Sequence, residues 1–133
     1  MASIIVNRGL LRLGQQSFKS TNYNVNRHIQ TMSFDDSATA FTAAATGLGS
    51  PTNEFDAAFD VTPTETGQTI ICTTTIPTGS GNFTIRRIAE HDDTAANVTG
   101  ASATLVGGVD AQNLTKTVDF ALAATKNYTF TSI

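Results

Sequence analysis

The sequence predicts an all-β protein: an antiparallel β-sandwich or jelly-roll-like barrel with an N-terminal arm and at most one short helix. Three observations support this prediction. The chain has 133 residues, the length of one domain. Threonine makes up 23 of these residues, and this β-branched residue fits a half-exposed pleated surface better than a helix. From residue 54 onward, apolar and polar residues alternate, and turn-forming residues recur at intervals of about 10–12 residues.

Charge divides the chain into two unequal parts. The first 34 residues contain no acid and carry four basic residues, whereas the remaining 99 carry all eleven acids against four basic residues. A net charge of −3 therefore conceals a basic segment of +4 joined to an acidic body of −7. Such a division is typical of a protein that docks onto a partner by one end.

Residues 1–20 are expected to form an N-terminal docking arm, and residues 21–133 a single β-sandwich body. Gly9 and Gly14 argue against a long helix in the arm. Its arginines can make bidentate contacts to carboxylates, and its aliphatic residues can serve as an apolar anchor. The candidate partner-binding residues are Ile4, Ile5, Arg8, Leu10, Leu11, Arg12 and Leu13.

A strand is expected within residues 22–34, followed by the one plausible helix. Asp36 or Ser37 would supply the helix N-cap, and Gly47 or Gly49 would end the helix. Apolar residues recur in this segment at a helical spacing of three and four residues. They are Ala38, Phe41, Ala45 and Leu48.

Strand patterns dominate the rest of the chain. Residues 55–62 and 70–76 alternate cleanly, and the breaker-rich segment 77–82 is predicted to join residues 70–76 to 83–85 as a hairpin. Residues 105–109 are short strand material interrupted by two glycines. Residues 118–132 form one long strand or two halves around 125–127, with Lys126 marking where the apolar face reaches solvent.

No catalytic motif occurs, so the protein is not expected to be an enzyme or to use a cofactor or resident metal. Glu90–Asp93 is interpreted as a solvated turn in a polar loop over 90–102; a cation site is the alternative. His28 is expected at a surface or interface, and Cys72 in the core.

Composition also argues against several partners. Eight basic residues are too few for a phosphate-tracking face, and Arg86 and Arg87 should point to opposite faces of a strand, so no nucleic acid is expected. No apolar run is long enough to span a membrane, and the N-terminus lacks the pattern of a signal peptide. The chain has no Trp, and its only exposed-aromatic candidates for a sugar platform are Tyr23 and Tyr128.

Nine segments spread over nearly the whole chain carry a resemblance to known proteins: 7–10, 29–32, 35–37, 52–56, 67–69, 82–87, 91–94, 114–117 and 128–133. They resemble small structural proteins of tailed bacteriophages, which are variously described as head-decoration, cement or tail-fibre-like proteins.

The resemblance implies a capsid cement protein that is made in the host cytoplasm and resides on the capsid exterior of the virion. Its partners would be the major capsid protein and itself, as a homotrimer. A tail-fibre, collar or tail-hub component is the alternative, and a carbohydrate- or cell-surface-binding module is the second alternative.

Overall fold

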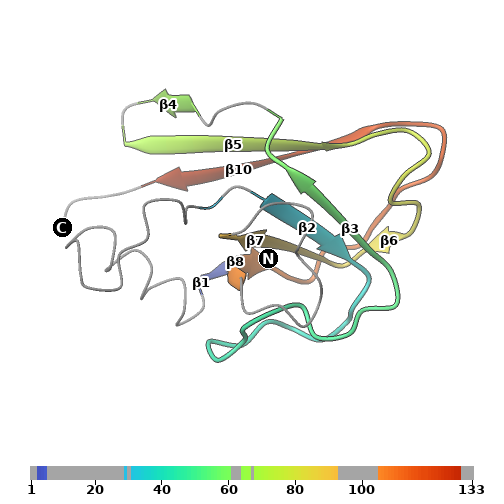
Figure 1. Cartoon of the computed structure of the whole chain (residues 1–133), viewed down its shortest axis with the longest axis horizontal. Helices are drawn as coiled ribbons and strands as arrows, with labels where there is room; N and C mark the ends of the chain where they lie inside the picture. Colours follow the sequence, from blue (N-terminus) through green and yellow to red (C-terminus); the bar gives the residue numbers. More distant parts are fainter. Residues whose placement is uncertain are drawn as a thin grey trace.

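The structure, a computed structural model, describes residues 3–5, 29, 31–60, 64–66, 68–92 and 105–129. Throughout these ranges the chain is all-β, with antiparallel sheets in a sandwich-like arrangement and no helix (Figure 1). The predicted fold class is therefore confirmed.

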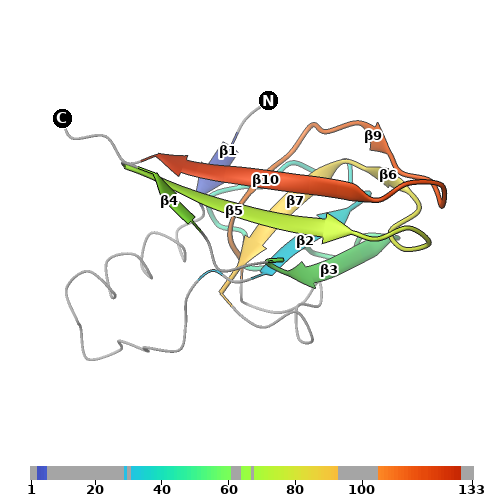
Figure 2. The ribbon, with the colours of Figure 1, turned by 90° about the horizontal axis from the view of Figure 1, so that it is seen from above.

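Two main sheets make up the described part of the body. The larger has five antiparallel strands in the order β1 (Ser3–Ile5), β8 (Leu105–Val109), β7 (Arg87–His91), β2 (Thr31–Asp35) and β3 (Glu54–Ala58). The smaller has β10 (Leu122–Thr129), β5 (Thr69–Ile76) and β4 (Thr64–Thr66), and lies over the larger one (Figures 1 and 2). A third pair, β6 (Thr84–Ile85) with β9 (Leu114–Thr115), lies at one end.

Alternation along the strands builds the core between the two sheets. In β5, every second residue near its end is buried, namely Cys72, Thr74 and Ile76, as its sequence pattern predicts. Met32 and Phe34 of β2 meet this row from the opposite sheet. The single cysteine is a free thiol within this core, as expected.

A second apolar cluster lies on the other face of the five-stranded sheet. Phe41 and Leu48 pack there against Ala89 of β7 and Leu105 of β8. The predicted helix is wrong, because residues 36–53 run over this face without helical structure. Phe41, Ala45 and Leu48 do reach this core, whereas Ala38 is exposed. Polar contacts with Arg87 of the sheet hold the segment in place of a helical backbone.

The predicted hairpin between residues 70–76 and 83–85 is also wrong. β5 pairs with β10 and β4, whereas β6 pairs with β9. The intervening turn is present, and Gly79 and Gly81 adopt φ values of +84° and +60° in it. The turn leads the chain out of the smaller sheet instead of back along β5. The pairing is set by β9 and β10, which lie far along the sequence.

The two glycines of β8 do not interrupt that strand. A Cβ atom on Gly107 would lie 2.7 Å from the Ile4 carbonyl oxygen, and one on Gly108 would lie 2.5 Å from the Phe41 ring. These glycines therefore allow β1 and the Phe41 ring to approach β8 closely.

The C-terminal pattern forms one strand, β10, which begins only at Leu122. Residues 118–121, expected to be strand, lie outside it, and residues 118–119 form a turn. Lys126 does not mark a solvent-exposed part of the apolar face, since its side chain is only 20 % exposed and pairs with a buried carboxylate. Residues 130–132 of this pattern lie outside the described part of the chain.

Candidate functional site

Two candidate partner-binding residues of the predicted docking arm, Ile4 and Ile5, lie on β1 at the edge of the larger sheet. Ile4 packs against the cluster around Phe41, and Ile5 is 43 % exposed. Register pairing of Ser3–Ile5 with Val109–Gly107 makes β1 part of the body's sheet. The remaining arm candidates lie outside the described residues: Arg8, Leu10, Leu11, Arg12 and Leu13.

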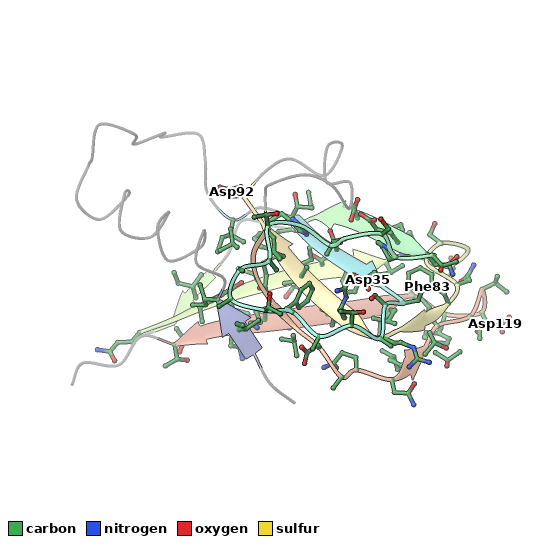
Figure 3. All side chains as sticks on the ribbon, turned by 90° about the horizontal axis from the view of Figure 1, so that it is seen from below. Asp35, Phe83, Asp92 and Asp119 are labelled. Carbon is green, nitrogen blue, oxygen red and sulfur yellow. The ribbon has the colours of Figure 1, made fainter. Side chains whose placement is uncertain are left out.

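An exposed apolar group, here termed the apolar tip, consists of Leu114, Val118 and Phe120. These three and Ile5 are the large hydrophobic residues exposed in the described part of the chain, and Val118 is 59 % exposed. Figure 3 labels Asp119, which lies in the same turn at the far end of the long axis, well away from Asp92. The sequence did not indicate this group, because Val118 and Phe120 share the parity of the apolar face of β10 and lie within the predicted strand 118–132.

Lys116 holds the turn that carries the apolar tip. Its side chain is buried, and its Nζ atom donates hydrogen bonds to Asn82 Oδ1 (3.3 Å) and to the Thr117 carbonyl (3.1 Å). The same atom lies 5.6 Å from the centre of the Phe120 ring. The apolar side chains therefore project from an anchored turn.

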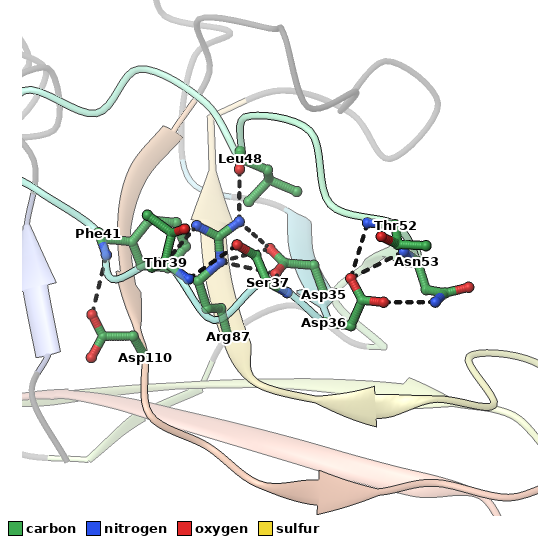
Figure 4. Close-up of polar contacts among 10 residues, drawn as sticks. All are labelled: Asp35, Asp36, Ser37, Thr39, Phe41, Leu48, Thr52, Asn53, Arg87 and Asp110. Carbon is green, nitrogen blue, oxygen red and sulfur yellow. Dashed lines mark hydrogen bonds and ion pairs between the residues drawn. The ribbon is translucent and has the colours of Figure 1, made fainter.

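Asp35 and Arg87 form a buried ion pair on the outer face of the larger sheet (Figure 4). The Nε atom of Arg87 lies 2.9 Å from Asp35 Oδ1, and Nη2 lies 2.9 Å from Oδ2. Neighbouring strands bring the two residues together, since they are register partners on β2 and β7. Asp35 is the last residue of β2, and its Oδ1 atom also accepts a hydrogen bond from the Ser37 amide (2.8 Å).

The remaining donors of Arg87 secure the irregular segment 36–53. Nη1 donates to the Thr39 carbonyl (3.0 Å) and Nη2 to the Leu48 carbonyl (2.6 Å), while the guanidinium stacks 4.5 Å from the Phe41 ring centre. Asp110 accepts a bond from the Phe41 amide (3.1 Å). One guanidinium thus joins two strands to both halves of the segment.

Beside this pair, two carboxylates lie on the edge strand β3. Glu54 and Asp56 share one face of the sheet, opposite Asp35 and Ser33 of β2. Burial raises the pKa of Glu54 to about 7, and the neighbouring Asp56 carboxylate adds to the rise. Burial likewise raises the pKa of Asp56, and side-chain hydrogen bonds with Ser33 and Glu54 partly offset this rise.

Glu90 occupies the interior between the two sheets. Its carboxylate lies 3.3 Å from Lys126 Nζ, and burial raises its pKa while Lys126 opposes the rise. Burial and the Glu90 charge raise the pKa of Tyr128. A cavity of about 330 Å³ lies beside the pair and is lined by Met32, Ile85, Ile88, Val109, Leu122 and Ala124, among others.

The interpretation of Glu90–Asp93 as a solvated turn is wrong for its described residues. Glu90 and His91 belong to β7, and Asp92 follows directly; all three are buried. Asp93 and the rest of the expected loop, 94–102, lie outside the described ranges. The polar sequence suggested exposure, but Glu90 is buried because its carboxylate forms an ion pair with Lys126, which is distant in the sequence.

The chemistry of the described residues is that of packing and charge pairing. Burial raises the pKa of the Cys72 thiol, which disfavours the reactive thiolate. Across ranges 31–60, 68–92 and 105–129, no three His, Cys, Asp or Glu side chains form a group suited to hold a metal ion. Arg86 is exposed and Arg87 buried, so the two point to opposite faces as expected.

Comparisons with known proteins identify no relative: no family model, no curated protein and no solved structure matches this chain. Among the described residues, no helix is long and apolar enough to cross a membrane. His28 and Tyr23 lie outside these residues.

Proposed function

We propose that this protein is a structural component of a tailed-bacteriophage particle, specifically a capsid cement protein that binds over junctions between major capsid protein subunits. The observation that carries the proposal is the charge division, in which an acid-free segment of 34 residues precedes an acidic body. The resemblance of segments along the chain to phage structural proteins supports the same assignment.

The body offers a second contact area besides the arm. The apolar tip presents Leu114 of β9 together with Val118 and Phe120 of the following turn, which Lys116 anchors. Little side-chain and backbone freedom is therefore lost when a partner covers them. The basic arm and the apolar tip would then contact different parts of the capsid shell.

Such a protein stabilises a shell by mass action. A ligand that binds only the assembled state stabilises it by about 2.7 kcal/mol per site at a hundredfold excess over Kd. Repetition over many equivalent junctions turns modest contacts into resistance to internal pressure. A homotrimer matches the threefold symmetry of such junctions.

The first test is the copy number of the chain in purified particles, measured by densitometry against the major capsid protein. A copy number comparable to that of the capsid subunit supports the cement function. A copy number of only a few per particle contradicts it and favours a tail component, and absence from particles rejects both.

Variants then separate the two contact areas. Arg12→Glu should weaken decoration of cement-free capsids, whereas Arg86→Glu, the same charge change on the exposed body, should not. Val118→Ser should weaken decoration relative to Ala121→Ser, a control at an exposed position in the same turn. Equal decoration by all four variants contradicts the proposed docking surfaces.

A further inference from the structure

The cavity between the two sheets lies against the backbone edge of β10. Five consecutive residues of this strand, Leu122–Lys126, line the cavity, which has a volume of about 330 Å³. Successive side chains of a strand point to opposite faces of its sheet, so a cavity that contacts all five reaches the edge of the strand and not only one face. In the described part of the chain, β10 is the outermost strand of the smaller sheet, on the side away from β4 (Figure 2). This cavity and the strand edge beside it are termed the β10 groove.

Hydrogen bonds of the neighbouring strand β5 show which backbone groups of β10 face outward. The Thr73 carbonyl accepts a hydrogen bond from the Asp60 amide (2.8 Å), and the Thr75 amide donates one to Asp60 Oδ1 (2.9 Å). Both groups therefore point away from β10. Opposite residues of an antiparallel ladder alternate between hydrogen-bonded and non-hydrogen-bonded pairs, and Thr73 is the register partner of Thr125. The N–H and C=O groups of Thr125 and Ala123 consequently point away from β5, toward the free edge.

The edge of β10 lacks the features that usually block further strand pairing. Such features are charges, prolines, bulges or a very short strand. At the other edges of the two main sheets, β3 contains Glu54 and Asp56, β4 contains Glu65, and β1 has three residues. β10 has eight residues and one charged side chain, Lys126, which pairs with the buried Glu90. Among these edges, β10 therefore offers the longest stretch of backbone without an outward charge.

The side chains around the groove are mainly aliphatic and come from both sheets. Met32 and Ile88 of the larger sheet line it, as does Leu114 of β9. The two charged lining residues, Glu90 and Lys126, lie 3.3 Å apart and neutralise each other. A side chain that enters the groove meets no unbalanced charge, so an uncharged aliphatic side chain fits it best.

We propose that the β10 groove binds an extended segment of a partner protein, which adds a strand to the smaller sheet beside β10. Main-chain hydrogen bonds to Ala123 and Thr125 would hold the segment, and its alternate side chains, which would be aliphatic, would enter the cavity. The body carries four basic residues and eleven acids, a formal charge of −7. Basic residues on either side of the inserted stretch would therefore favour binding.

A free segment fits the groove better than β10 of a second copy does. The inward side chains of β10, among them Leu122, Ala124 and Tyr128, already pack in the core of their own body. Pairing of two such strands would extend the sheet but leave the groove unfilled. Neither β1 nor Val118 lines the groove, so peptide binding there and decoration of capsids can fail independently of each other.

The probe is a blocked, fluorescently labelled peptide in which valine and threonine alternate and a lysine stands at each end. A length of about seven residues, at about 3.3 Å per residue, covers the stretch 122–126. Titration with the full chain should give a saturable rise in fluorescence anisotropy. The expected Kd is roughly 10⁻⁵ to 10⁻⁴ M, because an extended peptide loses conformational freedom on binding. The same peptide with glutamates in place of the lysines should bind more weakly.

Variants of the protein separate the backbone contact from the side-chain contacts. Thr125→Pro removes an outward amide and should weaken binding by about fivefold. Thr125→Ala loses the side chain and its hydrogen bond to Thr73 Oγ1 (3.2 Å) but keeps the amide, so it should bind as wild type does. Leu114→Ser should weaken binding by about threefold. Val118→Ser, at an exposed apolar position outside the groove, should not.

Two N-methylated peptides test the same hydrogen bonds without altering the protein, and they decide the question even if Thr125→Pro fails to fold. One is methylated at its valines and the other at its threonines, so each blocks one edge of the added strand, and only one of the two should lose binding. Equal binding by both peptides, or no saturable binding to the wild-type protein, overturns the proposal. Dimerisation of the protein that Thr125→Pro abolishes and Thr125→Ala preserves, measured by analytical ultracentrifugation, would place a second copy at β10 and also overturn it.

Discussion

The Nζ atom of Lys126 on β10 lies 3.3 Å from the Oε1 atom of Glu90 on β7, so one ion pair joins the two sheets through the core. Glu90 is almost completely buried, whereas Lys126 keeps partial contact with solvent. Removing one partner of such a pair costs more than the pair contributes, because an uncompensated charge remains in the interior.

Lys126→Met should therefore lower the free energy of unfolding by about 2–3 kcal/mol at pH 8. Burial already raises the folded-state pKa of Glu90 above its unfolded value, and loss of Lys126 should raise it further. The folded state then binds more protons than the unfolded state, so stability falls as the pH rises above the ordinary Glu range.

Urea denaturation at pH 5 and pH 8 checks this. Lys126→Met should lose more stability at the higher pH, and the additional change Glu90→Gln should recover part of the loss. Equal stability of Lys126→Met and wild type at pH 8 would show that the pair does not hold the sheets together.

Arg87→Lys should destabilise the protein by about 2 kcal/mol, although it conserves charge. An ammonium group cannot reach the Asp35 carboxylate and the Thr39 and Leu48 carbonyls together, and those buried acceptors would lose donors. Limited proteolysis should detect faster cleavage within residues 36–53. Arg86→Lys, at the exposed neighbouring position, should stay within about 0.5 kcal/mol of wild type.

Gly108→Ala should cost at least about 2 kcal/mol. The new methyl group would lie 2.5 Å from Phe41 Cε2 and 2.9 Å from the Ile88 carbonyl oxygen, and the backbone atom cannot move without disturbing the sheet. At Gly49 nothing lies within 4 Å, although φ is +78°. Gly49→Ala should therefore cost about 1 kcal/mol, from backbone strain alone. A comparison of thermal unfolding midpoints distinguishes the two, and equal losses would contradict the close approach of Phe41.

Stability should depend on pH through Glu54. The folded-state pKa of about 7 lies above the ordinary Glu pKa of 4.5, so between these two pH values the folded state holds a proton that the unfolded state releases. Stability should fall as the pH rises from about 4.5 to about 7 and level off above. Because Glu54 is half-exposed, solvent screening limits the change to about 1 kcal/mol.

Chemical denaturation across that pH range measures the effect. Glu54→Gln should flatten this part of the profile relative to wild type, whereas Asp119→Asn should leave it unchanged. An unaltered slope in Glu54→Gln would show that another group titrates.

Local patterns were sufficient to predict the all-β class and several elements. Alternation placed Cys72 and Ile76 inside β5, and the glycine-rich turn after it is present. These features could be predicted because side-chain alternation and turn chemistry are properties of neighbouring residues. The arm residues Arg8–Leu13 remain a prediction, since they lie outside the described residues.

Only the tertiary structure determined which charged side chains pair with one another. Asp35 and Arg87 are separated by 52 positions in the sequence, so no local pattern indicated that the two side chains would pair. Glu90 and Lys126 were each expected in solvent for the same reason. By itself, the sequence determined which residues alternate and where the chain turns, because those preferences are local. Which strands pair, and therefore which charges meet in the interior, depends on contacts between distant segments that form only when the two sheets pack.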